Sequence, residues 1–161
     1  FERRFKHVET SLKTLEKSPS QSTLEEMDEF WNEAKELEKI RIIGLTGGAA
    51  SGKSTVRELF REAGFETLDA DLVVRDLSAP GGEAFDKIKK YFKTDDKKEI
   101  RARVFSNEAD RKALESILHP LVRKKMIEHA KKLPKGTTLI YEATLLVETG
   151  RYRDCESLIV V

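Results

Sequence analysis

The sequence predicts an α/β fold: a parallel sheet flanked by helices and preceded by a helical hairpin. Short runs rich in β-branched residues alternate with stretches of helical apolar periodicity after residue 40. A glycine-rich segment joins the first of these runs to a helical pattern, whereas residues 1–39 show helical periodicity alone. Such alternation favours parallel strands joined by right-handed crossovers.

Residues 1–39 are expected to form the hairpin. Apolar side chains recur at helical spacing in two stretches, and a turn-rich break at 17–22 separates them. Thr23, followed by Glu26 three positions later, fits a capping box that opens the second helix. We therefore divide the chain into a hairpin over 1–39 and a second domain, with the strands, over 40–161. An apolar stripe on each arm could support self-association.

The remaining elements follow from runs and periodicity. Strands are predicted over 40–46, 65–68, 137–141 and 157–161, the first and last as buried strands. The helix after the first strand should end at Gly64. Further helices are predicted over 72–77, 83–92, 108–118 and 121–133.

Composition is that of a globular chain with a charged surface. Of 161 residues, 39% are hydrophobic and 37% charged, and the formal net charge is +1. This balance predicts neither a nucleic-acid nor a membrane partner, and no apolar run approaches the ~20 residues that span a bilayer. The lone Cys155 cannot form an internal disulfide, so a cytoplasmic location is expected.

The segment from Gly47 to Ser54 matches the phosphate-binding pattern Gly-x-x-x-x-Gly-Lys-Ser. Backbone amides at a helix N-terminus can cradle phosphates, and glycines let them approach closely. Lys53 should reach the β- and γ-phosphates of ATP, and the Ser54 hydroxyl should bind Mg²⁺. The expected nucleotide contacts are Gly47, Gly48, Ala50, Ser51, Gly52, Lys53, Ser54 and Thr55. A glycine-rich turn that binds nothing is the alternative, which the flanking strand and helix disfavour.

Acidic residues follow the second predicted strand. In an open α/β sheet, ligands gather at the carboxyl ends of strands, so Asp69 and Asp71 should face the same crevice as the loop. Asp71 could orient or deprotonate an acceptor hydroxyl, and Arg75 could bind an acceptor phosphate. One of the two aspartates is expected to be a helix cap, and Arg75 fits a solvated surface arginine equally well.

Several blocks resemble dephospho-coenzyme A kinases, in that family's order: 44–56, 68–71 with Arg75, 79–82, 104–107, 114–120 and 145–150. The resemblance implies a P-loop kinase-type parallel sheet, so that 40–161 would be a P-loop nucleotide kinase domain. It further implies ATP-dependent phosphorylation of the ribose 3′-hydroxyl of dephospho-CoA. It also implies that Asp71 is the base, with Lys53 as the second catalytic residue. By the same resemblance Arg75 and His119 line the acceptor site, and Glu148 is a candidate there. Taken alone, His119 before a proline at a helix junction indicates a structural hinge.

The chain departs from the family in three places. Glu142-Ala143-Thr144 stands where the family usually has Asp-x-Pro, and Glu142 is expected to keep an acidic role near the metal. The stretch 93–98 is shorter than expected. The family's arginine-bearing lid would follow Val161, so we expect the kinase domain to be incomplete at its C-terminus. The chain also begins with Phe1 instead of Met, which is expected of a piece of a longer protein.

Residues 1–9 and 24–35 resemble the C-terminal tail of MazG-type nucleoside triphosphate pyrophosphohydrolases. The metal-binding carboxylates of that family lie upstream of this tail, so no hydrolase activity is expected here. Two alternatives to a dephospho-CoA kinase stay open. One is a different small-molecule P-loop kinase, and the other is an inactive nucleotide-binding fragment of a bifunctional pyrophosphohydrolase–kinase.

Overall fold

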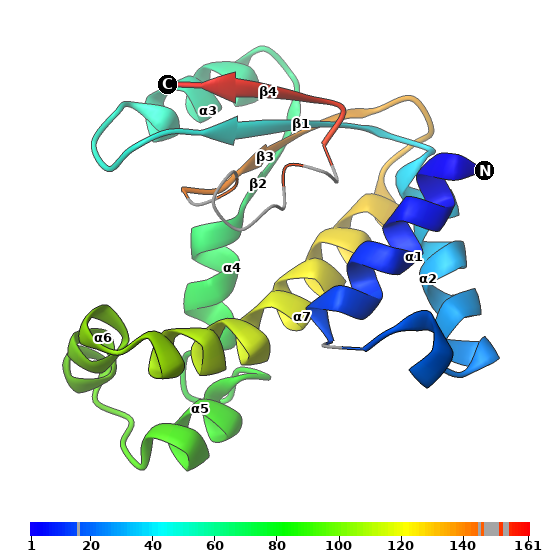
Figure 1. Cartoon of the computed structure of the whole chain (residues 1–161). Coiled ribbons are helices and arrows are strands. Elements are labelled where there is room, and N and C mark those ends of the chain that lie inside the picture. Colours follow the sequence, from blue (N-terminus) through cyan, green and yellow to red (C-terminus); the bar gives the residue numbers. More distant parts are fainter. Residues whose placement is uncertain (16, 145, 147–151, 153–154) are drawn as a thin grey trace. The chain divides into compact units, whose positions relative to one another are not determined.

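Parallel strands form the predicted sheet in the computed structural model, which describes all residues except 16, 145, 147–151 and 153–154 (Figure 1). Within the described residues the sheet has four strands in the order β2-β3-β1-β4. Their bounds are β1 Arg41–Thr46, β2 Glu66–Asp69, β3 Thr138–Glu142 and β4 Ser157–Val160. All three pairings are parallel, which confirms the predicted α/β class.

The middle of the sheet is buried and its β4 edge is not. Leu45 of β1 and Ile140 of β3 are fully buried, and each of these strands has a neighbour on both sides. The expectation that 157–161 is a buried strand was wrong, since β4 pairs with β1 alone among the described residues and Val160 is 71% exposed. Gly44 has no room for a side chain: a Cβ there would lie 2.5 Å from methyl carbons of Leu146 and Leu158.

The chain separates into two compact units. One contains Phe1–Asp71 and Met126–Val161, and holds the sheet and the N-terminal helices. The other contains Leu72–Lys125 and is built from helices. None of the described helices has the length and apolar character to span a membrane.

The N-terminal hairpin forms as predicted. It consists of α1 (Glu2–Thr14), a short 3₁₀ turn (Pro19–Gln21) and α2 (Leu24–Leu37), and α1 packs against α2. The capping box is present: the Glu26 amide donates to Thr23 Oγ1 at 3.2 Å and the Thr23 amide to Glu26 Oε2 at 3.1 Å. Val8, Leu12, Ala34 and Leu37 are buried, whereas Phe1, Phe5 and Leu24 are exposed. The domain boundary near residue 40 stays a prediction.

The helical unit begins within α4 (Ala70–Leu77), whose first residues belong to the sheet-containing unit. It also contains α5 (Phe85–Phe92), α6 (Lys97–Ser106) and most of α7 (Glu108–Lys132). The prediction of two helices over 108–118 and 121–133 was wrong, because α7 is continuous with Pro120 inside it. Leu118, Val122 and Met126 are buried at four-residue spacing across the proline. Their burial offsets the cost of an interior proline, about 3 kcal/mol. His119 is therefore not at a hinge.

Helix α6 was not predicted. Its sequence has no continuous apolar stripe, and Phe105 is 92% exposed, so helical periodicity is weak. The available signal is its N-cap: Asp96 Oδ1 accepts a hydrogen bond from the Lys98 amide at 2.8 Å.

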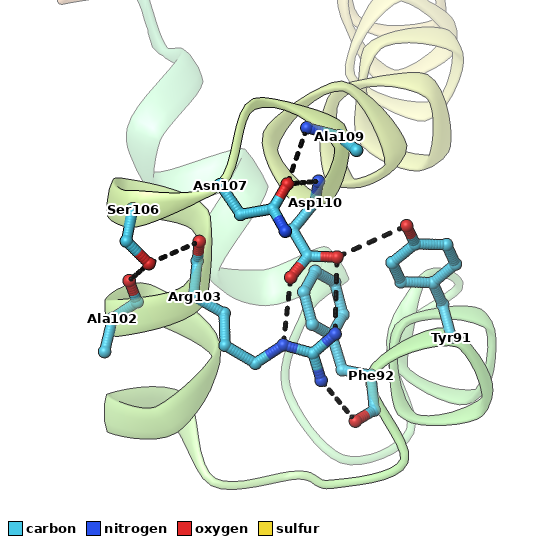
Figure 2. Close-up of polar contacts among 8 residues, drawn as sticks. All are labelled: Tyr91, Phe92, Ala102, Arg103, Ser106, Asn107, Ala109 and Asp110. Atoms are coloured by element: carbon cyan, nitrogen blue, oxygen red, sulfur yellow. Dashed lines mark hydrogen bonds and ion pairs between the residues drawn. The ribbon is translucent and has the colours of Figure 1, made fainter.

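One polar cluster joins α5, α6 and α7 (Figure 2). Arg103 donates through Nε to Asp110 Oδ2 at 2.9 Å and through Nη2 to Asp110 Oδ1 at 3.3 Å. It also donates to the Phe92 carbonyl at 2.9 Å and lies 4.9 Å from the Phe92 ring centroid. Tyr91 donates to Asp110 Oδ1 at 3.3 Å. The buried Asp110 is thus the common acceptor of two helices.

Asp110→Asn should lower the melting temperature, because the new amide N–H group would face the donors of Arg103 and Tyr91 in a buried position. Thermal unfolding followed by circular dichroism measures this. Asp95→Asn, which breaks an exposed ion pair with Lys89 instead, is the matched control and should change the melting temperature little. Equal melting temperatures for the two variants would contradict this role of Asp110.

Candidate functional site

The phosphate-loop segment connects β1 directly to α3 (Lys53–Glu62) and has the unusual backbone that its glycines predict. Gly47 has φ 151° and Gly52 has φ 98°, both in the region that disfavours side chains. A Cβ at Gly47 would also lie 2.2 Å from the Val161 carbonyl oxygen. Ala50, between these two glycines, also has a positive φ of 61°.

Lys53 lies over this loop. It is buried, and its Nζ donates to the carbonyl oxygens of Gly47 at 2.9 Å and Gly48 at 2.6 Å. The first helical hydrogen bond of α3 comes from Val56 to Gly52, so the amides of the first turn have no intrahelical acceptor. Ser51 Oγ is buried without a hydrogen-bond partner in the described part of the chain. Donors and a cation therefore converge at one helix N-terminus, as an anion site requires.

Three strands end at the same level beside the loop. In the sheet register, Glu142 of β3 is opposite Asp69 of β2 on one side and Leu45 of β1 on the other. Because β1 continues into the loop after Thr46, the acidic ends of β2 and β3 lie at the same edge of the sheet as the loop.

The two aspartates after β2 do different things. Asp69 Oδ1 accepts a hydrogen bond from the Asp71 amide at 2.9 Å, so Asp69 caps the start of α4. Asp71 is exposed, and its Oδ2 accepts a hydrogen bond from Thr144 Oγ1 at 2.8 Å. This leaves an accessible carboxylate at the strand ends, in the position expected of a group that meets an acceptor. Its role as the base stays a prediction.

Arg57 on α3 pairs with both Asp69 and Glu142, and sequence reasoning missed it. Its Nη1 donates to Asp69 Oδ2 and lies 2.9 Å from Glu142 Oε2. The Glu142 side chain is 5% exposed and that of Arg57 is 16% exposed, so the pairing is largely shielded from water. An arginine on an amphipathic helix gives no local signal of this role. The indirect signal was two acidic strand ends that need a counter-charge.

Burial and neighbouring charges shift the pKa values of both Glu142 and Arg57. Burial raises the pKa of Glu142, and Asp69 and Asp71 act in the same direction, while Arg57 and Lys53 oppose them. Burial works to lower the pKa of Arg57, but its hydrogen bond to Asp69 and the charge of Glu142 raise it overall. Glu142 Oε2 accepts no hydrogen bond within the described residues, so Arg57 holds it by charge alone.

The other predicted acceptor residues belong to the helical unit or fall outside the described residues. Arg75 is exposed in the last turn of α4, four residues after Asp71. His119 is half-buried within α7, and both residues belong to the helical unit. Glu148 lies outside the described residues. The acceptor roles of Arg75, His119 and Glu148 therefore stay predictions.

A parallel sheet whose first strand enters a Gly-x-x-x-x-Gly-Lys-Ser loop and a helix defines a P-loop α/β protein of the nucleotide-binding class. The family model described as Dephospho-CoA kinase matches residues 41–161. The chain therefore belongs to the dephospho-CoA kinase family.

Individual relatives agree. A dephospho-CoA kinase of Hydrogenovibrio crunogenus is 34% identical over 131 residues, which are 76% of this chain and 66% of the relative. That of Geobacillus kaustophilus is 40% identical over 129 residues, or 74% and 64% of the two chains. The crystal structure of TT1252 from Thermus thermophilus superposes with a TM-score of 0.66 at 31% identity, covering 75% of this chain and 64% of that one. The chain thus spans slightly less than two thirds of the length of these relatives.

Arg57→Met should destabilise the sheet-containing unit, because it removes the cation that contacts both Asp69 and Glu142. Near neutral pH the expected loss is about 3 kcal/mol, the usual effect of removing one partner of a buried pair. Without Arg57 the raised pKa of Glu142 rises further. The folded state then binds a proton more tightly than the unfolded chain, so the loss grows as pH rises through that pKa and shrinks in acid.

Urea unfolding near neutral pH and at about pH 5 separates these cases, since ordinary glutamates titrate near pH 4.3. Arg61→Met, at an exposed position on the same helix, is the control and should have little effect at either pH. A loss from Arg57→Met that is the same at both pH values would contradict the charge argument.

Proposed function

We propose that this chain supplies the nucleotide site and the acceptor carboxylate of an enzyme that transfers the γ-phosphoryl group of ATP to the ribose 3′-hydroxyl of dephospho-CoA. Family membership supports the reaction. The observation that carries the assignment to these residues is the shared sheet edge, where the phosphate loop and the exposed Asp71 carboxylate both lie.

The phosphate loop would hold the β- and γ-phosphates through the amides that open α3 and through the Lys53 ammonium. The Lys53 ammonium donates to two carbonyls of the loop itself, those of Gly47 and Gly48, so it is already held above the loop. The Ser51 hydroxyl, which has no partner among the described residues, offers a further hydrogen bond. The contacts proposed are those of Gly47, Gly48, Ala50, Ser51, Gly52, Lys53, Ser54 and Thr55.

In the proposed step, Asp71 accepts the proton of the 3′-hydroxyl as that oxygen bonds to the γ-phosphorus. The bond from the γ-phosphorus to the bridging oxygen breaks, and ADP leaves with that electron pair. Positioning and charge neutralisation account for most catalysis of phosphoryl transfer, which suits a site built from amides, one lysine and one carboxylate. Arg75, His119 and Glu148 are proposed to bind the rest of the acceptor.

Mg²⁺ fits the residues at the loop. The ion keeps several waters and usually takes one or two protein ligands beside phosphate oxygens. Ser54 is exposed at the start of α3, and the described residues contain no cluster of three acidic, histidine or cysteine side chains. We propose the Ser54 hydroxyl as a protein ligand of the ion, as the loop pattern implies. When bound, the ion would neutralise charge on the β- and γ-phosphates.

We also propose that residues 1–39 are the tail of an upstream pyrophosphohydrolase domain, on the strength of their resemblance to MazG-type enzymes. The exposed Phe1, Phe5 and Leu24 are suited to self-association or to contact with such a domain. A coding sequence upstream of Phe1 that lacks metal-binding carboxylates would contradict this. The lone Cys155 supports a cytoplasmic location, also a proposal.

Lys53→Ala should abolish phosphate transfer and weaken ATP binding, because the loop loses its only cation. Two measurements check this: ADP release in the presence of dephospho-CoA, and ATP binding by calorimetry. Arg61→Ala removes an exposed cation from the same helix and should leave both unchanged. Wild-type turnover in the Lys53 variant would overturn the assignment of the loop.

The proposed substrate predicts selectivity among alcohols. Dephospho-CoA should be phosphorylated faster than adenosine, other nucleosides or sugars, because only it presents a 3′-hydroxyl together with the pyrophosphate and pantetheine groups that position it. Radiolabelled ATP with each acceptor in turn measures the rates. Transfer to dephospho-CoA no faster than to the other alcohols would favour a different small-molecule kinase.

A further inference from the structure

Thr144 contacts the proposed base directly. It lies two residues after the end of β3, and its hydroxyl donates to Asp71 Oδ2 at 2.8 Å. A threonine hydroxyl has one proton, so this bond uses its whole donor capacity. One oxygen of the Asp71 carboxylate, Oδ2, is therefore occupied.

Thr144 is itself held by the strand that leads into the phosphate loop. Its carbonyl oxygen accepts a hydrogen bond from Thr46 Oγ1 at 3.3 Å, and the amide of its neighbour Ala143 donates to the Leu45 carbonyl at 3.0 Å. Thr46 is buried at the end of β1, immediately before Gly47. A chain of hydrogen bonds therefore runs from the start of the phosphate loop through Thr144 to Asp71.

We propose that Thr144 is a positioning residue that orients the Asp71 carboxylate relative to the phosphate loop. The inference rests on the proposed phosphoryl transfer. The main chain of Asp71 is held by Asp69, but its exposed side chain would otherwise rotate freely. The hydroxyl of Thr144 selects one orientation, in which one carboxylate oxygen is occupied and the other is presented to the acceptor hydroxyl.

Thr144→Val tests this because valine has the shape of threonine without the hydroxyl. The variant should lower kcat for phosphorylation of dephospho-CoA about tenfold, as expected when a reacting group loses its alignment. KM for ATP should not change, because the substitution keeps the backbone carbonyl through which Thr144 contacts Thr46. Thr144→Ser keeps the hydroxyl and should restore kcat to near the wild-type value.

A double-mutant cycle with Asp71→Asn separates positioning from a structural role. If Thr144 acts through Asp71, then Thr144→Val should cause no further loss of kcat in the Asp71→Asn background. The melting temperature of each variant is measured in parallel. An equal loss of kcat with and without Asp71, or a loss that Thr144→Ser does not recover, would overturn the inference.

Failure of the inference and failure of the proposed function give different results. If the wild-type chain phosphorylates dephospho-CoA and Thr144→Val has the same kcat, Thr144 has no positioning role but the function stands. If the wild-type chain transfers no phosphate to dephospho-CoA while Lys53-dependent ATP binding is retained, the proposed function fails, and the role of Thr144 fails with it.

Discussion

The pairing of Arg57 with Asp69 and Glu142 is the interaction on which the site depends. Arg57 lies on the helix that the phosphate loop opens, Asp69 ends β2 and Glu142 ends β3. Without a cation between them, two carboxylates at neighbouring strand ends would repel each other, one of them in a buried position. The guanidinium therefore allows the strands to end together, and it ties the loop helix to the residues that lead into Asp71.

Burying such a cluster costs desolvation energy that an apolar core would not require. The cluster fixes the positions of the residues around it. Asp69 caps α4 through the amide of Asp71, so the helix that carries the proposed base starts at a defined point. Thr144, two residues after β3, then holds Asp71 Oδ2 by a hydrogen bond. The constraints come from three neighbouring strands: Asp69 ends β2, Thr144 follows β3, and Thr46 of β1 donates to the Thr144 carbonyl. A rigid sheet can in this way place an exposed carboxylate accurately.

Local patterns predicted the elements whose signals are local. Strand positions, the hairpin and the Thr23–Glu26 cap were confirmed because β-branched runs, apolar periodicity and capping residues act over a few positions. Pro120 was misleading for the same reason: its local effect is to break helices, but buried side chains on both sides of it keep α7 continuous. Helix α6 escaped notice because it lacks an apolar stripe, and β4 was misjudged because its run resembles that of an inner strand.

The sequence alone determined the phosphate loop, the parallel α/β class and the presence of acidic residues after the second strand. The pattern of glycines and lysine is contiguous, and strand–helix alternation needs no knowledge of pairing. Only the tertiary structure decided which residues meet. Thr144 and Asp71 are 73 residues apart, and Arg57 on α3 pairs with Glu142 at the end of β3. Both contacts therefore depend on strand order and register. Those are set by the packing of the whole sheet, which no short segment of the chain encodes.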